Sequence, residues 1–400
     1  MAIPGRRLGI LAVAPLLLSA CAPLQPEAAL EVRSAAVGDP LPGLTPEELA
    51  RFEAGKAAFS KVYTQEEGLG PTHNENSCNA CHSWPTVGGS GAEEYDVHAT
   101  FQGEDGRCDL LDAHGGGNVR DLVTPIAAAV GVTPERIPPE ANQHGVFTAP
   151  ALWGVGLVEA IPDSVIEALA DPDDANGDGI SGRVGRDAQG RMGRLRRKAD
   201  RNNLEGMVSG GLLVALGITT PQHPEERVFS VDALPAGADP APDPEEDQAT
   251  VDIIEDYLRF LGVPPRNMPT DPAELARVAV GEKRFVEVGC AACHVPTLTT
   301  GPSPVAALDR KPVPLYSDLL LHDMGPAGAN ICSAAATPSE FRTEILMGIA
   351  TRTVFMHDAK APSLWEAIAQ HGGEGAASVD AFNALPELER HALVAFLLTL

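Results

Sequence analysis

Two short motifs carry the residues whose types and spacing point to chemistry. Both read C-x-x-C-H; the first ends at His82 and the second, far along the chain, at His294. Thiols three positions apart can add to the two vinyl groups of one porphyrin, and the adjacent histidine then reaches the iron as its proximal ligand. A zinc module or a thioredoxin-like pair is less favoured, because both motifs carry the histidine and a four-cysteine zinc module separates its pairs by only about 15–20 residues. The sequence therefore predicts two haem c groups, attached through Cys78, Cys81, Cys290 and Cys293.

The N-terminus has the layout of a bacterial export signal. Two arginines precede the apolar run Leu8 to Leu18, which is too short for a comfortable membrane span. The run leads to Leu-Ser-Ala-Cys21, which resembles a lipobox, and an alanine rather than an aspartate follows Cys21. We therefore expect a lipoprotein signal peptide over residues 1–20 and a lipid anchor on Cys21, more consistent with the outer than with the inner membrane. A Pro-, Ala- and Glu-rich tether over residues 21–44 would follow; an ordinary secretion signal is the alternative.

Two cysteines remain once four are assigned to haem and one to lipid. They are Cys108 and Cys332. In an oxidising periplasm a leftover pair suggests a disulfide, and two unconnected thiols are the alternative.

Composition limits the size of the core and the class of partner. A chain of 400 residues exceeds one hydrophobic core, so we expect two domains. Only 4% of the residues are aromatic, against 35 prolines and 40 glycines, which suits a loop-rich protein whose core is partly porphyrin. The net charge of -26 argues against nucleic acid and anionic membrane surfaces as partners and permits a basic redox protein.

An internal repeat divides the chain. Residues 46–59 and 272–285 share Pro, Glu, Leu, Ala, Arg, Gly and Phe at a constant offset. Each copy predicts an amphipathic helix that opens with an N-cap and a first-turn proline and leads into a haem motif. Helices over residues 251–261 and 388–399 would close the two halves, and cytochrome c domains pack such a helix across the one before the haem. We therefore expect a mainly α fold of two tandem cytochrome-c-like domains with long loops and little sheet.

This interpretation assigns residues 45–270 to an N-terminal haem c domain and residues 271–400 to a C-terminal one. The acidic, Pro- and Ala-rich run 233–248 is a loop near their boundary.

The segment Asp174 to Ile180 has the D-x-N-x-D-G spacing of a calcium loop. The expected oxygen ligands come from Asp174, Asn176, Asp178 and the backbone of Ile180, with a glycine at the sharp turn. The twelfth position is Gly185, so the usual bidentate glutamate is absent. An Asp/Asn/Gly turn without metal is the alternative.

The order of these motifs resembles the bacterial di-haem oxidoreductase family, sometimes labelled thiol oxidoreductase and related to the di-haem cytochrome c peroxidases and MauG. The resemblance covers roughly residues 45 to 400 and rests on APALWGVGLVEAIP (149–162), DPDDANGDGISGR (171–183), YSDLLLHDMG (316–325), FMHD (355–358) and HGGE (371–374). The chain departs from the family pattern at Ala359-Lys360 and at residues 344–348.

The resemblance implies a periplasmic, peroxidase-like oxidoreductase. Electrons from a redox donor protein would enter at the haem of His294 and be used at the haem of His82, on peroxide or a similar oxidant. A di-haem electron carrier without substrate is one alternative, and an oxygen-dependent oxidase or oxygenase is another.

Iron coordination separates these functions, because a six-coordinate haem moves electrons and a five-coordinate haem can bind an oxidant. For the second haem the resemblance points to His371 as the distal ligand, with Met324 as the alternative. For the first haem His98, His144 and Glu159 are candidate acid–base groups in an open pocket. A surface or structural role is the competing interpretation for each.

Overall fold

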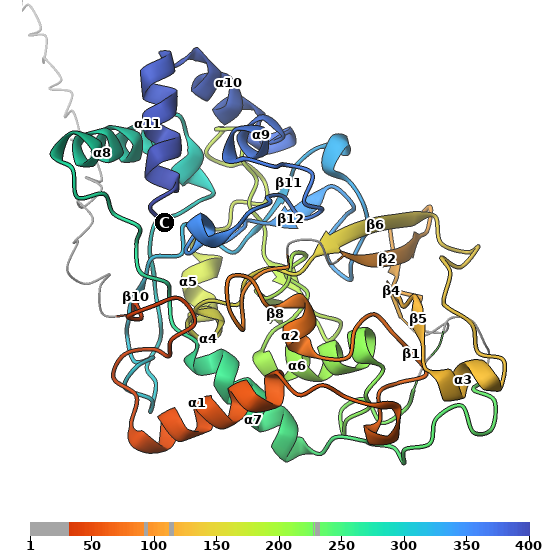
Figure 1. Cartoon of the computed structure of the whole chain (residues 1–400). Helices are drawn as coiled ribbons and strands as arrows, with labels where there is room; N and C mark the ends of the chain where they lie inside the picture. Colours follow the sequence, from red (N-terminus) through yellow and green to blue (C-terminus); the bar gives the residue numbers. More distant parts are fainter. Residues whose placement is uncertain (1–31, 92–94, 112–115, 227, 229–232) are drawn as a thin grey trace, which may run out of the picture.

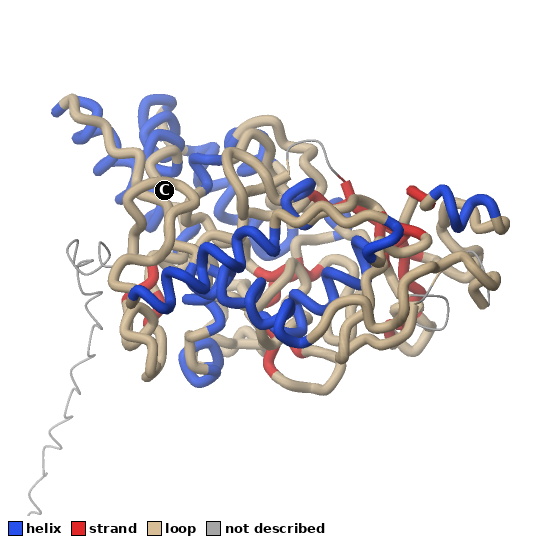
Figure 2. Tube along the Cα trace, turned by 60° about the horizontal axis from the view of Figure 1, so that its bottom comes forward, coloured by secondary structure: helices blue, strands red, loops and turns tan. Residues whose placement is uncertain are grey.

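The computed structural model describes residues 32–91, 95–111, 116–226, 228 and 233–400. It is 33% helical and 13% strand, and long loops join the elements (Figure 2). The helices are α1 Pro46–Phe59, α2 Cys78–Cys81, α3 Pro125–Ala129, α4 Val155–Glu159, α5 Asp163–Glu167, α6 Leu204–Gly211, α7 Gln248–Phe260, α8 Pro272–Glu287, α9 Leu364–Ala369, α10 Ala376–Ala384 and α11 Glu387–Leu397. The strands are β1 Thr72–His73, β2 Tyr95–Gln102, β3 Cys108–Asp109, β4 Asn118–Val119, β5 Leu122–Val123, β6 Gln143–Thr148, β7 Gly185–Arg186, β8 Met192–Gly193, β9 Leu298–Thr299, β10 Pro312–Val313, β11 Leu321–Asp323 and β12 Glu340–Arg342. Helices outweigh strands, as expected, but the sheet content is higher than the sequence suggested.

The two helices of the internal repeat begin where the sequence predicts. The Thr45 side chain accepts a hydrogen bond from the Glu48 backbone N–H, and the Glu48 carboxylate accepts one from the Thr45 backbone N–H, which completes a capping box at α1. The Asp271 side chain caps α8 in the same position, and proline follows the cap in both helices. Local sequence therefore sets both helix starts.

Each repeat helix crosses the helix that closes its half. Helix α1 packs against α7, and α8 packs against α11 (Figure 1). The matched glycines of the repeat lie at these crossings: a Cβ on Gly55 would overlap the Ile253 carbonyl oxygen, and one on Gly281 would overlap that of Ala392. A glycine allows the two backbones to approach this closely.

A four-stranded antiparallel sheet, which the sequence analysis did not anticipate, adjoins the first half. Strand β2 pairs with β3, β4 and β6, and Asp96 lies opposite Phe147 in the register of β2 and β6. Polar and apolar residues alternate along β2, since Asp96, His98 and Thr100 are separated by Val97 and Ala99. The signal for a strand was therefore present.

The hydrophobic core crosses the expected domain boundary. The largest buried cluster joins residues of the first half, such as Leu157 and Tyr257, to the segment 298–320. A second cluster consists of residues 278–400. The predicted split at residue 270 therefore does not separate two independent cores.

The described part of the predicted tether packs against the protein. Val32 and Leu41 are buried, the Ser34 N–H donates to the Val263 carbonyl at 2.8 Å, and the Leu41 N–H donates to Phe260 at 2.7 Å. Residues 32–44 are therefore not a free tether, because their apolar side chains are buried beside the end of α7. Residues 1–31, with the predicted signal and Cys21, lie outside the described residues.

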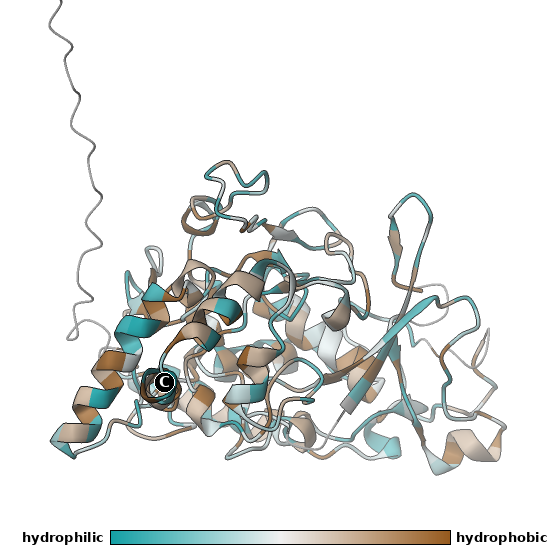
Figure 3. Cartoon of the chain, turned by 90° about the horizontal axis from the view of Figure 1, so that it is seen from above, coloured by the Kyte–Doolittle hydropathy of each residue, from teal (hydrophilic) through white to brown (hydrophobic). Residues whose placement is uncertain are grey.

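Hydrophilic and hydrophobic residues are mixed along the helices at the C-terminal end of the molecule (Figure 3). Within the described ranges, no helix has both the length and the apolar character needed to cross a bilayer.

Candidate functional site

The first C-x-x-C-H motif opens into a cavity of about 390 Å³, here called cavity 1. Cys78 and Cys81 lie on the single turn of α2, where the Ser77 side chain accepts a hydrogen bond from the Asn79 N–H. A spacing of three residues brings both thiols to one side of the turn. Both thiols and His82 line cavity 1.

The second motif opens into a separate cavity of about 220 Å³, cavity 2. Cys290 begins a 3₁₀ turn shortly after α8, and Cys290, Cys293 and His294 all line the cavity. The four motif cysteines form no disulfide. A thiol pair and a histidine that share one cavity fit the attachment of one haem c at each place.

Both proximal histidines are oriented by the backbone. The Nδ1 atom of His82 lies 2.9 Å from the Pro150 carbonyl oxygen, and that of His294 lies 2.9 Å from the Tyr316 carbonyl oxygen. An Nδ1–H donated to a carbonyl leaves Nε2 as the metal-binding nitrogen. Burial lowers the pKa of His82, and burial followed by the charge of His371 lowers the pKa of His294 to about 4. Both rings are therefore neutral, the form that binds iron.

The repeat places an aromatic ring beside each proximal histidine. The ring centres of Phe59 and His82 are 6.1 Å apart at an interplanar angle of 57°, and those of Phe285 and His294 are 6.3 Å apart at 52°. Phe59 and Phe285 are matched positions of the repeat. The two halves therefore build their haem motifs on the same local packing.

A second imidazole faces His294 across cavity 2. The ring centres of His294 and His371 are 6.4 Å apart. An imidazole nitrogen binds a metal at about 2 Å and lies about 1.1 Å from its ring centre, so two rings on opposite sides of one ion have centres about 6.3 Å apart. The Nδ1 atom of His371 lies 2.7 Å from the Ala367 carbonyl oxygen, which again leaves Nε2 for the metal. The geometry fits an iron between the two rings.

Met324, the alternative ligand, also lines cavity 2. A Cβ on Gly375 would contact both the Met324 methyl and the His371 side chain, at 3.4 and 3.1 Å. Met324 therefore lies next to His371.

A buried histidine between two carboxylates supports the same wall of cavity 2. The His322 nitrogens lie 2.9 Å from an Asp318 oxygen and 2.8 Å from a Glu374 oxygen. Burial alone would lower the pKa of His322, but hydrogen bonds and charge interactions with Asp318 and Cys293 together outweigh burial and raise the pKa to about 11. His322 is therefore a cation, and through Glu374 it fixes the chain just after His371.

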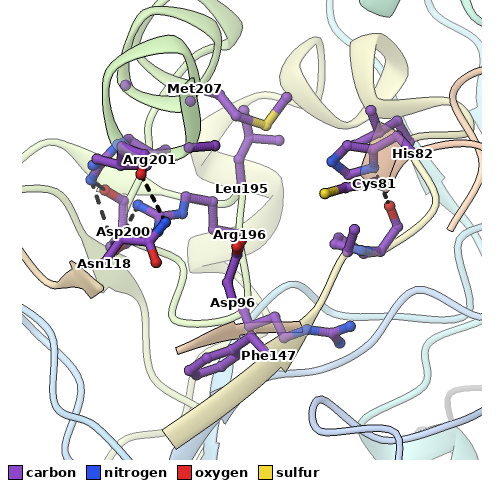
Figure 4. Close-up of a pocket in the computed structure, with 18 of the residues that line it drawn as sticks. Cys81, His82, Asp96, Asn118, Phe147, Leu195, Arg196, Asp200, Arg201 and Met207 are labelled. Carbon is purple, nitrogen blue, oxygen red and sulfur yellow. Dashed lines mark hydrogen bonds and ion pairs between the residues drawn. The ribbon is translucent and has the colours of Figure 1, made fainter. Parts of the chain in front are cut away.

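Strand β2 presents a polar face to cavity 1. Asp96, His98 and Thr100 alternate along the strand and all line the cavity. Burial, together with the positive charge of Arg196, lowers the pKa of His98 to about 3, so its ring is neutral. Burial raises the pKa of Asp96. In Figure 4, Asp96 and Phe147 lie in the lower part of cavity 1, and His82 and Cys81 lie at one side of it.

Asp96 was missed by the sequence analysis, although the alternation along β2 could have revealed it. Cavity 1 also receives Asp200 and Arg201, seen at the side opposite His82 in Figure 4. Met207 adds a thioether to its wall.

The other two acid–base candidates lie outside both cavities. His144 is exposed on β6, where alternate residues point outward. The Glu159 carboxylate accepts a hydrogen bond from the Leu204 N–H at 2.8 Å and lies 3.5 Å from Arg259. It therefore serves the N-terminus of α6 and an ion pair, and only His98 of the three faces cavity 1.

The predicted calcium loop forms a series of side-chain to backbone turns. The Asp174 carboxylate accepts from the Gly179 N–H at 3.2 Å, Asn176 accepts from Asp178 at 2.8 Å, and Asp178 accepts from Ile180 at 2.9 Å. In the described part of the chain, clusters of three His, Cys, Asp or Glu side chains close enough to hold a metal ion lie elsewhere and not in this loop.

A disulfide joins Cys108 of β3 to Cys332, and the two residues are 224 positions apart. This is the pair that remained after the haem and lipid cysteines were assigned. The bridge ties the sheet of the first half to a loop of the second.

Comparison with known proteins identifies the family. A family model described as "Di-haem oxidoreductase, putative peroxidase" matches residues 140–400. The matched part contains the second haem motif, His371 and the expected calcium loop. No curated protein sequence matches the chain significantly.

Three of the solved structures that match the chain share 14% sequence identity with it. Hydrazine synthase of Kuenenia stuttgartiensis has a TM-score of 0.41, with 100% of both chains covered. A MauG-like protein associated with microbial copper homeostasis has a TM-score of 0.39, with 92% of this chain and 93% of the other covered. A variant of the dihaem peroxidase BthA from Burkholderia thailandensis has a TM-score of 0.40, with 91% and 87% covered.

The family match covers well over half of the chain, and two thiol–histidine cavities suited to haem agree with it. The chain therefore belongs to the di-haem oxidoreductase family and is a peroxidase-like oxidoreductase.

Proposed function

We propose that this protein is a periplasmic di-haem c peroxidase in which electrons enter at cavity 2 and reduce peroxide at cavity 1. One observation carries the proposal, the asymmetry between the two proximal histidines. His294 faces His371 at a distance suited to a shared iron. Among the described residues, the aromatic ring next to His82 is that of Phe59, and no second imidazole lies as close to His82 as His371 lies to His294.

This asymmetry assigns different roles to the two cavities. A haem held in cavity 2 by both His294 and His371 would be suited to electron transfer, whereas a haem held in cavity 1 by His82 alone could admit an oxidant. When bound, the haems supply one-electron transfer and reductive cleavage of the peroxide bond. Cavity 2 is then the electron-entry site and cavity 1 the peroxide site.

His98 is the proton acceptor that we propose for cavity 1. Peroxide cleavage needs a group that takes a proton from the near oxygen and returns it to the leaving one. The neutral His98 ring lines cavity 1 beside Asp96, on the same face of β2. Their shared face supports a joint role in proton transfer.

Each half is proposed to be a cytochrome-c-like domain. The repeated helix crossings at Gly55 and Gly281 and the repeated rings Phe59 and Phe285 support this view. The core shared across residue 270 means that the two domains fold against each other.

The proposal also includes the location of the protein and its redox partner. C-type haem attachment, the lipobox ending at Cys21 and the disulfide agree with an exported protein held at the outer membrane. The net charge of -26 favours a basic redox donor protein. Replacing Cys21 with serine should abolish incorporation of labelled fatty acid and release the protein from the membrane fraction.

Calcium binding at residues 174–180 is proposed as a link to cavity 2. Ile180 lines that cavity, and the Ser181 hydroxyl donates to the Glu374 carboxylate at 2.7 Å. The holoprotein is first freed of bound metal ions with a chelator, which is then removed. Calorimetric titration with Ca²⁺ should show one binding site, and Asp178→Asn should lower its affinity for Ca²⁺. Absence of binding would leave the loop as a structural turn.

The decisive experiment counts haems and spin states in the pure oxidised protein. Mass spectrometry should show two haem additions, and EPR should show one low-spin and one high-spin haem. His82→Gly should abolish peroxide turnover while the low-spin signal remains. Two low-spin haems that are inert to peroxide in every redox state would favour an electron carrier, and turnover that requires oxygen and an organic substrate would favour an oxidase or oxygenase.

The proposed proton-transfer role of His98 can be tested against a matched control substitution on β6, the strand that pairs with β2. His98→Gln should lower kcat/KM for peroxide by about 10²–10⁴-fold, because the proton acceptor is lost. His144→Gln changes the same residue type on β6, outside the cavities, and should leave turnover unchanged. Equal effects of the two variants would remove His98 from the mechanism.

A further inference from the structure

Among the residues that the structure describes, four line both cavities, and all four are charged. They are Arg197, Arg342, Glu344 and Arg352, here called the cationic partition. Arg197 follows β8, Arg342 ends β12, and Glu344 and Arg352 lie in the loop after β12. Segments far apart in the chain thus supply the wall between the two proposed haem sites.

The single carboxylate of the partition, that of Glu344, already interacts with all three arginines. Glu344 Oε2 lies 3.1 Å from Arg197 Nη1 and 3.9 Å from Arg342 Nη2. Glu344 Oε1 accepts a short hydrogen bond from Arg352. Burial opposes ionisation of Glu344, but these three guanidinium groups outweigh it and hold its pKa well below the usual range.

The partition is buried and carries an excess of positive charge. The side chains of Arg197, Arg342 and Arg352 are 11%, 8% and 10% exposed. Within the partition, three guanidinium groups against one carboxylate leave two positive charges unbalanced, and the carboxylates outside it that act on these arginines are Asp358 on Arg197 and Asp318 on Arg342. Buried charges without partners are strongly destabilising.

One donor group of the partition also lacks an acceptor. Arg197 Nε is buried and has no hydrogen-bond partner, although its Nη2 donates to the Thr148 carbonyl at 3.3 Å. Burial lowers the pKa of Arg197 to about 10 and also lowers that of Arg342. An anion that enters from the cavities would relieve both the charge excess and the missing acceptor.

We propose that the cationic partition binds one propionate group of each haem c and thereby sets the two reduction potentials together. Two propionates match the two unbalanced charges, and a guanidinium group binds a carboxylate with paired hydrogen bonds. The thiol pairs of the two motifs fix a haem in each cavity, and these four residues form the wall common to both cavities. The inference rests on the proposed pair of haem c groups.

The proposal predicts opposite effects for two substitutions of the same size. A nearby positive charge favours the reduced haem, because reduction adds an electron. Arg342→Gln should therefore shift both midpoint potentials to lower values, whereas Glu344→Gln should shift both to higher values. General loosening of the fold cannot produce shifts of opposite sign.

Spectroelectrochemical titration of the holoprotein measures both potentials. Arg191→Gln is the matched control, because Arg191 is half-exposed, pairs with Asp187 at 2.7 Å and lines neither cavity. It should leave both potentials at the wild-type values. Arg342→Lys keeps the charge and should return both potentials towards those values.

The outcomes separate this inference from the function on which it rests. Mass spectrometry and EPR of each preparation establish whether two haems with different spin states are present, and their absence would overturn the proposed function. With two haems present, a shift of only one potential, or of neither, in Arg342→Gln would overturn the shared propionate site alone. Wild-type potentials that depend on added phosphate at constant ionic strength, with the dependence lost in Arg342→Gln, would assign the partition to a solution anion and also overturn it.

Discussion

At the scale of single residues, three histidines share one arrangement. His82, His294 and His371 each have Nδ1 within 2.9 Å of a backbone carbonyl oxygen and a ring in one of the two cavities. A neutral ring held in this way presents Nε2 to a metal. The backbone thus orients all three rings in the same way.

The distal ligand of cavity 2 can be tested by substitution. His371→Ala should convert the low-spin haem to high spin, because it removes the second imidazole. Met324→Leu should keep the low-spin EPR signal if His371, as proposed, is the ligand. A low-spin signal that survives His371→Ala and disappears in Met324→Leu would reverse the assignment.

The charge of His322 predicts how the stability of the protein depends on pH. Its folded pKa of about 11 lies above the ordinary value of 6.5. The contribution of His322 to the free energy of unfolding is therefore complete at pH values below its ordinary pKa, and it is lost as the pH rises through the pKa of the folded protein. His322→Gln should lower the free energy of unfolding by about 3–5 kcal/mol at low pH, because it leaves buried carboxylates unpaired.

Urea unfolding of the wild type and of His322→Gln at about pH 6 and about pH 10 measures this difference. The gap between the two proteins should narrow at the higher pH. A gap that is constant or widens with pH would show that His322 is not a cation in the folded protein.

At the scale of elements, two helix pairs support the two haem motifs. The pairs α1–α7 and α8–α11 each cross at a glycine of the repeat. Phe59 and Phe285, near the C-terminal ends of α1 and α8, then reach the proximal histidines. Helix packing therefore determines the position of each motif.

Closing the space at these crossings should cost stability. Gly55→Ala and Gly281→Ala should each lower the free energy of unfolding by about 1–3 kcal/mol, since the new methyl group overlaps a carbonyl oxygen of the partner helix. Val280→Ala on α8 is the control, because Val280 is exposed and lines neither cavity. It should change the free energy of unfolding by no more than about 0.5 kcal/mol. Denaturant titration compares the three, and equal effects would argue against tight crossings.

At the scale of the whole molecule, the two halves are joined by shared structure. The largest core cluster combines residues of both halves, and both haem cavities share the cationic partition. The disulfide between Cys108 and Cys332 adds a covalent link between the halves. Electron transfer between the cavities would take place within one packed unit.

Removing the disulfide tests how much this link contributes. The double substitution Cys108→Ser and Cys332→Ser should lower the free energy of unfolding by about 2–5 kcal/mol, because the bridge closes a loop of more than two hundred residues in the unfolded chain. A reducing agent should destabilise the wild type and have no effect on the double variant. A stability unchanged by either treatment would show that the core alone holds the halves together.

The sequence by itself determined the features that depend on short spacing. The C-x-x-C-H motifs, the capped starts of α1 and α8 and the repeated Gly55 and Gly281 all follow from residues close together in the chain. Cysteine counting also left one pair, Cys108 and Cys332, which the structure joins. Capping, helical periodicity and thiol spacing are local effects, so they can be inferred without knowledge of the fold.

Only the tertiary structure decided which distant residues meet. It brought His371 opposite His294, turned His98 towards cavity 1, and placed His144 and Glu159 elsewhere. It also joined Arg197 to Glu344 across more than a hundred residues of chain. Long loops let such residues lie at almost any separation, and the face that a strand such as β2 presents is set by what packs against it. These contacts depend on non-local packing, which spacing along the chain does not encode.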